Sequence, residues 1–207
     1  MAGTRRVGNR TSKTRAALLS HAEKLMLDEG YAAVTYRAVA ARAGVTSGLV
    51  QYYFPILDDL FTALVRHRSE QGLALLAEGL AKGPPLRAVW AYASDWIAAT
   101  LTYELMALSN HRKTIRAEIA RAGEEARAMA LDALAKAPPS PVPAGPGAVE
   151  PAPEVLVFLM TNIPRVMAME AAAGMTTAHA ETIAFVERYL DRLEPLQTPA
   201  SPGPPCT

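Results

Sequence analysis

The sequence predicts an all-α protein in which a small N-terminal domain of three helices precedes a larger helical domain. Of its 207 residues 50% are hydrophobic, so the chain can bury a core. Alanine is frequent while β-branched and aromatic residues are sparse, and this balance favours helix over sheet. Long stretches also place apolar residues at helical spacing, which indicates amphipathic helices.

The first predicted helix covers residues 12–29. Its apolar face is formed by Ala16, Leu19, Ala22, Leu25 and Met26. Gly30 ends this helix, because glycine readily adopts the left-handed conformation of a helix C-terminus.

Two short helices follow, over residues 36–43 and 47–53. Thr35 and Thr46 precede them and are good N-caps, since a threonine hydroxyl accepts a hydrogen bond from a free backbone N–H. Gly44 lies between them and supplies the positive φ of a tight turn. The small Ala40 and the apolar Val39, Val45 and Val50 would hold the helices together. The pattern predicts a helix-turn-helix.

The rest of the chain is predicted as longer helices separated by turn signals. The expected segments are 57–80 after Pro55, 86–105 after Gly83-Pro84-Pro85, a charged helix from Asn110 to about 136, and a final antiparallel pair at 154–173 and 176–194 joined near Gly174. Pro164 is expected to kink or split its helix. The proline-rich segment 137–153 is interpreted as a long loop inside one domain.

We therefore divide the chain into three parts. Residues 1–55 form an arm and a helix-turn-helix DNA-binding domain, residues 56–194 a helical effector-binding and dimerisation domain, and residues 195–207 a disordered tail. The net charge of +1 hides an asymmetry, because residues 1–54 hold eight basic and three acidic residues, a net charge of +5. The remainder then carries −4. A basic end on an acidic body favours a polyanionic partner, although short basic tails also serve solubility alone.

Residues 12–64 resemble the N-terminal domain of the tetracycline-repressor (TetR) family. The residues that carry the resemblance are Ala22-Glu23-Lys24-Leu25, Glu29-Gly30-Tyr31, Val34-Thr35, Val39-Ala40-Ala41-Arg42-Ala43-Gly44-Val45-Thr46-Ser47-Gly48, and Tyr52-Tyr53-Phe54 with Leu60. The resemblance implies a regulator, typically a repressor, that binds a palindromic operator in double-stranded DNA as a homodimer. It also implies release from DNA by a small effector.

The same resemblance implies which residues touch DNA. Contacts to phosphates are expected from Thr35, Tyr36 and Arg37, and contacts in the groove from Thr46, Ser47, Gly48, Gln51, Tyr52 and Tyr53. Gln51 is chemically the best base reader, because its amide makes paired hydrogen bonds to adenine. The tyrosines have an alternative interpretation as partly buried packing. Arg5, Arg6 and Arg10 follow the DNA backbone, enter the minor groove, or form a solvated arm.

One position departs from the family pattern. Where the family usually has a phosphate-binding lysine after the aromatic-Phe pair, this chain has Leu57. The acidic pair Asp58-Asp59 that follows is normal at a helix start. One charge-assisted phosphate contact is therefore expected to be missing.

The resemblance also implies an effector pocket in the helical body. The candidate lining residues are Trp90, Trp96, Tyr103, Met106, Phe158, Asn162, Met167 and Met169. The alternative is that these aromatic and methionine side chains simply pack the core. An apolar or amphipathic effector fits them better than a charged one. The run His111-Arg112-Lys113 indicates either an acidic-ligand contact or a solvated helix end.

The last two predicted helices carry more apolar surface than one hairpin needs, which favours a homodimer through residues 154–194. No catalytic motif is present, no cofactor is implied, and the four histidines make no evident metal site, so an enzyme is not expected. A helical adaptor without DNA binding is the remaining alternative.

Nothing in the sequence predicts a membrane protein. The first fifteen residues are polar and basic, and no apolar run reaches the ~20 residues of a spanning helix, since Asp95 and Pro164-Arg165 interrupt the longest candidates. The single cysteine, Cys206, excludes a disulfide within the chain. These features favour the cytoplasm.

Overall fold

The computed structural model describes residues 13–138 and 151–195, except for the side chain of Trp96. Within these ranges the chain forms helices and no strand, so the predicted all-α class is confirmed. The arm with Arg5, Arg6 and Arg10, most of the proline-rich loop, and the tail with Cys206 lie outside the described residues.

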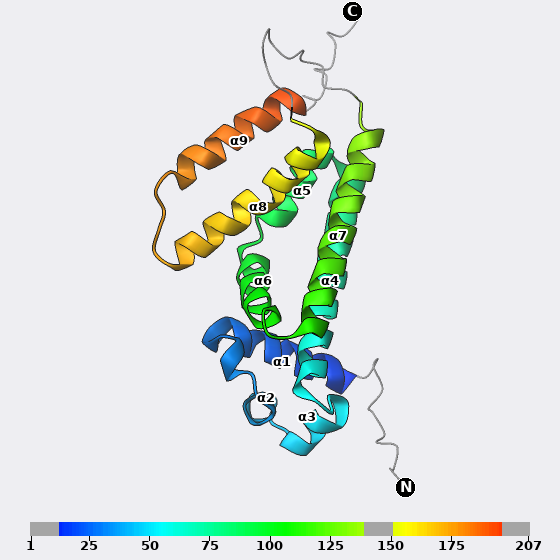
Figure 1. Ribbon diagram of the computed structural model, residues 1–207, viewed down its shortest axis with the longest axis vertical. Coiled ribbons are helices and arrows are strands. Elements are labelled where there is room, and N and C mark those ends of the chain that lie inside the picture. Colours follow the sequence, from blue (N-terminus) through cyan, green and yellow to red (C-terminus); the bar gives the residue numbers. More distant parts are fainter. Residues whose placement is uncertain (1–12, 139–150, 196–207) are drawn as a thin grey trace, which may run out of the picture.

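The first three α-helices form a small head at one end of the molecule (Figure 1). They are α1 (Lys13–Glu29), α2 (Tyr36–Ala43) and α3 (Ser47–Tyr53), with the short 3-10 helix η1 (Tyr31–Ala33) after α1. The predicted caps are confirmed, since the Thr35 hydroxyl accepts from the Ala38 N–H at 3.1 Å and the Thr46 hydroxyl from the Leu49 N–H at 3.3 Å. Gly44 turns the chain between α2 and α3 with φ 67°.

The head packs on the rest of the protein, the body, through one continuous core. Val39 and Val50 are fully buried between the head helices, as predicted, and Ala40 is nearly so. The same cluster includes body residues, among them Leu101, Leu105, Leu108 and Ile115. The sequence did not predict η1. The Glu104 carboxylate of the body accepts a hydrogen bond from the Tyr31 N–H at 2.7 Å, and this long-range contact holds the start of η1.

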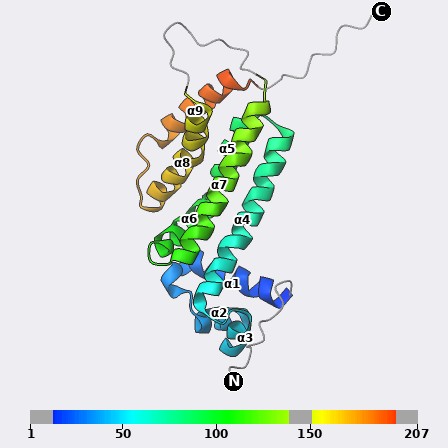
Figure 2. The same ribbon diagram turned by 45° about the vertical axis from the view of Figure 1, so that its right-hand side comes forward.

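Two long helices run alongside each other through the body (Figures 1 and 2). These are α4 (Leu57–Lys82) and α7 (Lys113–Lys136). The single helix expected over 86–105 was wrong, because the chain forms α5 (Pro85–Ala93) and α6 (Trp96–Ser109) instead. The Asp95 carboxylate accepts hydrogen bonds from the Ile97 and Ala98 N–H groups at 3.0 and 3.1 Å. This N-cap begins α6 and so separates it from α5.

The last two helices form an outer layer of the body (Figure 1). α8 (Pro153–Ala172) continues through Pro164, so the helix is not split. α9 (His179–Leu193) returns in the opposite direction after a turn in which Gly174 has φ 83° and Ala178 φ 63°. A second core cluster joins α4, α5, α7, α8 and α9, with Leu76, Val89, Met160, Val186 and Leu190 among its members.

One helix of the described part, α8, is long and apolar enough to cross a membrane by length and composition. The expectation that no apolar run reaches this length was therefore wrong by this measure, because Pro164 lies inside an unbroken helix. Only 22% of the apolar window of α8 is buried. Most of the apolar surface of α8 is therefore not covered by the rest of the chain that the structure describes.

Candidate functional site

The nine residues predicted to touch DNA gather at the start of α2 and along α3. Seven of them are exposed, namely Thr35, Arg37, Thr46, Ser47, Gly48, Gln51 and Tyr52. Their backbone is fixed by the two threonine caps and by the turn at Gly44, all formed by residues close in sequence. The face is therefore polar, solvent-accessible and held by local hydrogen bonds.

The tyrosines divide between packing and exposure. The Tyr36 hydroxyl donates a hydrogen bond to the Phe54 carbonyl at 2.9 Å, which ties the start of α2 to the end of α3. Tyr53 is half-buried against the core of the head and meets the Tyr52 ring edge-on, with centroids 5.2 Å apart. Tyr52 itself is 45% exposed. Of the three, Tyr52 presents most of its ring to a partner.

Of the arginine side chains that the structure describes in the head, some are already engaged in contacts within the protein. Arg42 forms an ion pair with Asp28, and its Nη1 lies 3.9 Å from the Glu29 carboxylate. The Arg15 guanidinium lies 4.9 Å from the centroid of the Phe54 ring. Arg37 is exposed and has no ion pair within the described residues. Of the two arginines of α2, Arg37 is therefore the one that faces solvent without an ion pair among the described residues.

Leu57 occupies the position of the expected lysine and packs, half-buried, against the core of the head. The next residue, Asp58, forms an ion pair with Arg112 at the start of α7. The Arg112 guanidinium also lies 5.7 Å from the centroid of the Phe61 ring. Within the run His111-Arg112-Lys113, Arg112 is thus a contact between α7 and α4, while its two neighbours are exposed.

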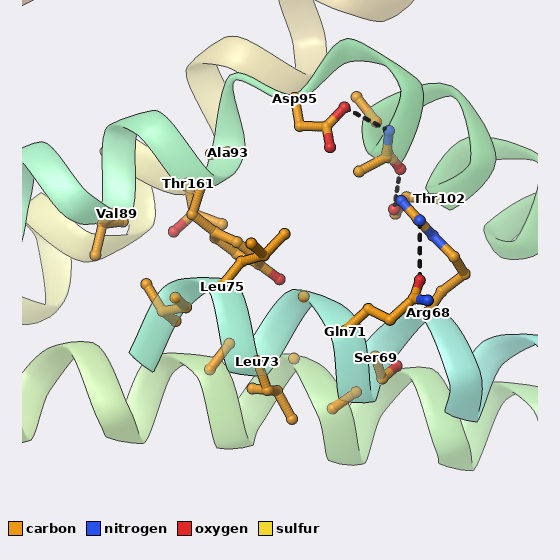
Figure 3. A pocket seen from close by; sticks show the side chains of 18 of the residues that line it. Arg68, Ser69, Gln71, Leu73, Leu75, Val89, Ala93, Asp95, Thr102 and Thr161 are labelled. Atoms are coloured by element: carbon orange, nitrogen blue, oxygen red, sulfur yellow. Dashed lines mark hydrogen bonds between the residues drawn. The ribbon is translucent and has the colours of Figure 1, made fainter. Parts of the chain in front are cut away.

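A cavity of about 840 Å³ lies inside the body between α4, α5, α6, α7 and α8 (Figure 3). Its apolar lining includes Val65, Leu75, Val89, Leu101, Leu105 and Ile119. Its polar lining includes Arg68, Gln71, Tyr92, Thr102, Thr161 and Arg165. A space of this size, whose wall is mainly apolar surface with polar groups among it, has the usual character of a small-molecule site.

The polar groups of the cavity are arranged around Arg68 and Arg165. Arg68 points toward Thr102 of α6 and donates a hydrogen bond to the Gln71 side chain at 3.2 Å (Figure 3). The Arg165 guanidinium lies 5.9 Å from the centroid of the Tyr92 ring. Burial raises the pKa of nearby Tyr103, and the positive charge of Arg165 opposes that rise.

Of the effector candidates proposed from sequence, none with a described side chain lines this cavity. Trp90 packs against the second core cluster, Met106 and Phe158 are about half exposed, and Tyr103, Asn162, Met167 and Met169 also lie outside the lining. The Asn162 amide donates to the Phe158 carbonyl at 2.8 Å. The side chain of Trp96 lies outside the described residues.

The sequence reasoning selected large aromatic and methionine side chains, but the cavity is built mostly from other residues. Polar side chains of α4, such as Arg68 and Gln71, face it beside the small Gly72 and Ala74. The polar run over residues 66–71, followed directly by the small Gly72 and Ala74, was the available signal on α4.

Residues 18–64 match the family model described as bacterial regulatory proteins, tetR family. The head is a TetR-family N-terminal domain. The matched segment runs from α1 into α4 and contains the whole helix-turn-helix, so the resemblance seen in the sequence is confirmed.

Solved structures show that the TetR-family fold extends over the body. A transcriptional regulator from Rhodococcus sp. Rha1 has a TM-score of 0.68 and 18% identity, covering 89% of this chain and 99% of that one. A putative regulator from Saccharomonospora viridis, in complex with choline, has a TM-score of 0.67 and 14% identity, covering 87% and 96%. A ketosteroid transcriptional regulator from Mycobacterium tuberculosis has a TM-score of 0.59 and 17% identity, covering 92% and 99%.

These identities support the fold and not a shared ligand. No curated protein matches this chain. Among the residues that the structure describes, no group of three or more histidine, cysteine, aspartate or glutamate side chains is placed to hold a metal ion.

Proposed function

We propose that this TetR-family protein is a cytoplasmic transcriptional repressor that binds a palindromic operator as a homodimer and leaves it when a small effector fills the body cavity. The observation that carries the proposal is the exposed polar face of α3 beside the turn at Gly44, on a body that contains a cavity of about 840 Å³. A polar recognition helix fixed by a supporting helix is what major-groove binding requires.

The roles within the DNA-binding face follow from chemistry and exposure. Gln51 reads a base, because its exposed amide both donates and accepts hydrogen bonds. Arg37, Thr35, Thr46 and Tyr52 set the register through phosphates, and Ser47 and Gly48 let the helix approach closely. Tyr36 and Tyr53 contribute mainly by holding α2 and α3 in place, since both are half-buried.

The N-terminal arm supplies much of the attraction to phosphates. Residues 13–54 carry five basic and three acidic side chains, so three of the five net positive charges of the first 54 residues belong to Arg5, Arg6 and Arg10. With Leu57 packed into the core, alanine at the three arginines is expected to weaken DNA binding and flatten its salt dependence. An unchanged salt slope would contradict this role.

The exposed apolar side chains of α8 and α9 provide the dimer interface. The large ones are Val155, Phe158, Leu159, Val166 and Met169 on α8, Ile183 and Phe185 on α9, and Met175 between them. An apolar surface of this extent on a monomer marks an interaction site. Pairing with the same surface of a second copy gives a closed two-fold dimer. This also accounts for the mostly unburied α8.

The cavity accepts an amphipathic effector with a largely apolar body. One protein with a similar fold was solved in complex with choline, so this fold holds a small organic molecule elsewhere. Here, the lining combines leucine and valine side chains with a few polar groups. The effector is expected to lower operator affinity by favouring a different placement of the heads.

Selection of bound sequences from a random DNA pool, using the full chain, tests the proposal. The expected result is a near-palindromic site whose half-sites are about one helical turn apart. Gln51→Ala should relax the preference at one position in each half-site, whereas Gln71→Ala, the same change in the cavity wall, should leave the selected sequence unaltered. A pool without enrichment would instead support a helical adaptor.

A further inference from the structure

We propose that the body cavity takes an amphipathic carboxylate, whose carboxylate group is bound by Arg165. The proposal rests on the proposed function of the cavity as the effector site and adds the chemical class of the effector. Its basis is a positively charged side chain on the cavity wall that has no internal counterpart among the described residues.

Arg165 lies on the inner side of α8. It follows the buried Pro164 and is one helical turn after the buried Thr161, and it lines the cavity itself while only half exposed. Within the described residues, no hydrogen bond or ion pair involves its guanidinium. Its guanidinium lies 5.9 Å from the centroid of the Tyr92 ring, close to the outer limit of a cation–π interaction. Five N–H donors are therefore available.

The other charged residues of the cavity wall already have partners. Arg68 lies near Glu23, Glu78 pairs with Lys82, Arg127 pairs with Glu124, and Asp95 accepts two backbone N–H bonds at the start of α6. The first three have an ionic partner within the protein, and the Asp95 carboxylate is satisfied by two N–H groups. Arg165 is the exception in the part of the wall that the structure describes, so the charge that the cavity leaves unmatched is positive.

A guanidinium in a half-buried site is costly to desolvate unless an anion satisfies it. Its planar fork of donors matches a carboxylate with two parallel hydrogen bonds. Arg165 lies where α5, α6 and α8 meet, since it faces Tyr92 of α5 and acts on the ionisation of Tyr103 of α6. This position defines the polar end of the ligand site.

The rest of the wall suits a hydrocarbon body. Leu75 of α4 and Thr161 of α8 point into the space between their helices (Figure 3). Leu75 is 60% exposed although it faces this cavity, so the cavity leaves apolar surface in contact with water. An alkyl chain or fused ring would cover that surface. One carboxylate on an apolar body therefore satisfies both ends of the site.

Isothermal titration calorimetry on the full chain with three matched probes tests the proposal: decanoate, decanol and decyltrimethylammonium. Decanoate is expected to bind at least about tenfold more tightly than decanol, because the charge-assisted contact adds to the same apolar burial. Arg165→Gln should remove that advantage and leave decanol affinity unchanged. Arg127→Gln, at a wall arginine already paired with Glu124, should keep decanoate affinity within about twofold of the parent.

Arg165→Lys, which keeps the charge but loses the planar fork, should fall between the parent and Arg165→Gln for decanoate. This variant keeps the proposal testable if Arg165→Gln does not fold. Three results would each overturn the carboxylate assignment. They are equal affinity for decanoate and decanol, tighter binding of decyltrimethylammonium than of decanoate, and an unchanged decanoate affinity in the Arg165→Gln variant.

Operator binding without any ligand separates this inference from the proposed function. If an operator is selected and bound but decanoate binds no more tightly than decanol, only the proposed ligand class is wrong. If decanoate binds through Arg165 but no operator is enriched, the repressor function fails while the ligand class stands.

Discussion

Arg68 of α4 lines the body cavity, and its Nη1 atom lies 3.5 Å from the Oε1 atom of Glu23 on α1. Both side chains are largely buried, so this ion pair joins the cavity wall to the head. A second link runs from Glu104 of α6 to the Tyr31 N–H at the start of η1, directly after α1. A ligand that moves α4 or α6 would therefore act on α1 through polar contacts as well as through the shared core.

Glu23→Gln should weaken the attachment of the head to the body. We expect the free energy of unfolding to fall by about 1–2 kcal/mol, because Arg68 would keep its charge in a partly desolvated place. Urea unfolding measures this loss, and hydrogen exchange should show faster opening of α1. Glu78→Gln breaks the exposed Glu78–Lys82 pair and should cost less than about 0.5 kcal/mol. Equal losses in the two variants would contradict the structural link.

Two glycine-to-alanine changes should shift stability in opposite directions. Gly44 has φ 67° with open space around its Cα, so Gly44→Ala introduces backbone strain without a clash and should cost about 1–2 kcal/mol. Gly123 lies inside α7, also in open space, and Gly123→Ala should add about 0.5–1 kcal/mol. Denaturant unfolding of both variants checks the pair. A stabilised Gly44→Ala would disprove the left-handed turn.

Glu118 should make stability depend on pH in the acid range. The hydrogen bond from Arg66 lowers the pKa of this buried carboxyl, and Arg121 adds to the effect against the opposing influence of burial. A folded-state pKa below the unfolded value means that the stabilisation is complete above the ordinary glutamate pKa of about 4.3. It is lost as pH falls through the lowered value.

Thermal unfolding of Glu118→Gln against the parent measures this contribution. The variant should melt several degrees lower at neutral pH, and the difference should shrink toward zero in acid. Glu124→Gln, which removes an exposed pair with Arg127 on the same helix, should change little at either pH. A difference that stays constant with pH would rule out an ionised Glu118 as the cause.

The proposed dimer interface predicts different outcomes for two exposed methionines. Met169 on α8 is 45% exposed and Met106 on α6 is 49% exposed, so they are closely matched as monomer surface. Met169→Asp should shift the protein toward the monomer, because it buries an unpaired charge at the interface. Met106→Asp should leave the dimer intact. Sedimentation equilibrium distinguishes these results, and a monomeric parent chain would refute the interface.

The helix-turn-helix could be predicted from sequence because its determinants are local. Thr35 and Thr46 each bond an N–H three residues onward, and Gly44 turns the chain without help from distant segments. The same kind of local signal existed at Asp95, where the cap separates α5 from α6, but the apolar periodicity on both sides concealed it.

The sequence by itself determined the helical class, the capped head and the TetR resemblance, since short-range hydrogen bonds and helical periodicity are set by neighbouring residues. Tertiary structure alone decided that Tyr36 binds the Phe54 carbonyl, that Glu104 holds the start of η1, and that Arg68 and Arg165 line one cavity. These residues are far apart in the chain. Their contacts depend on the angles at which the helices cross. The spacing of apolar residues along the sequence does not predict those angles.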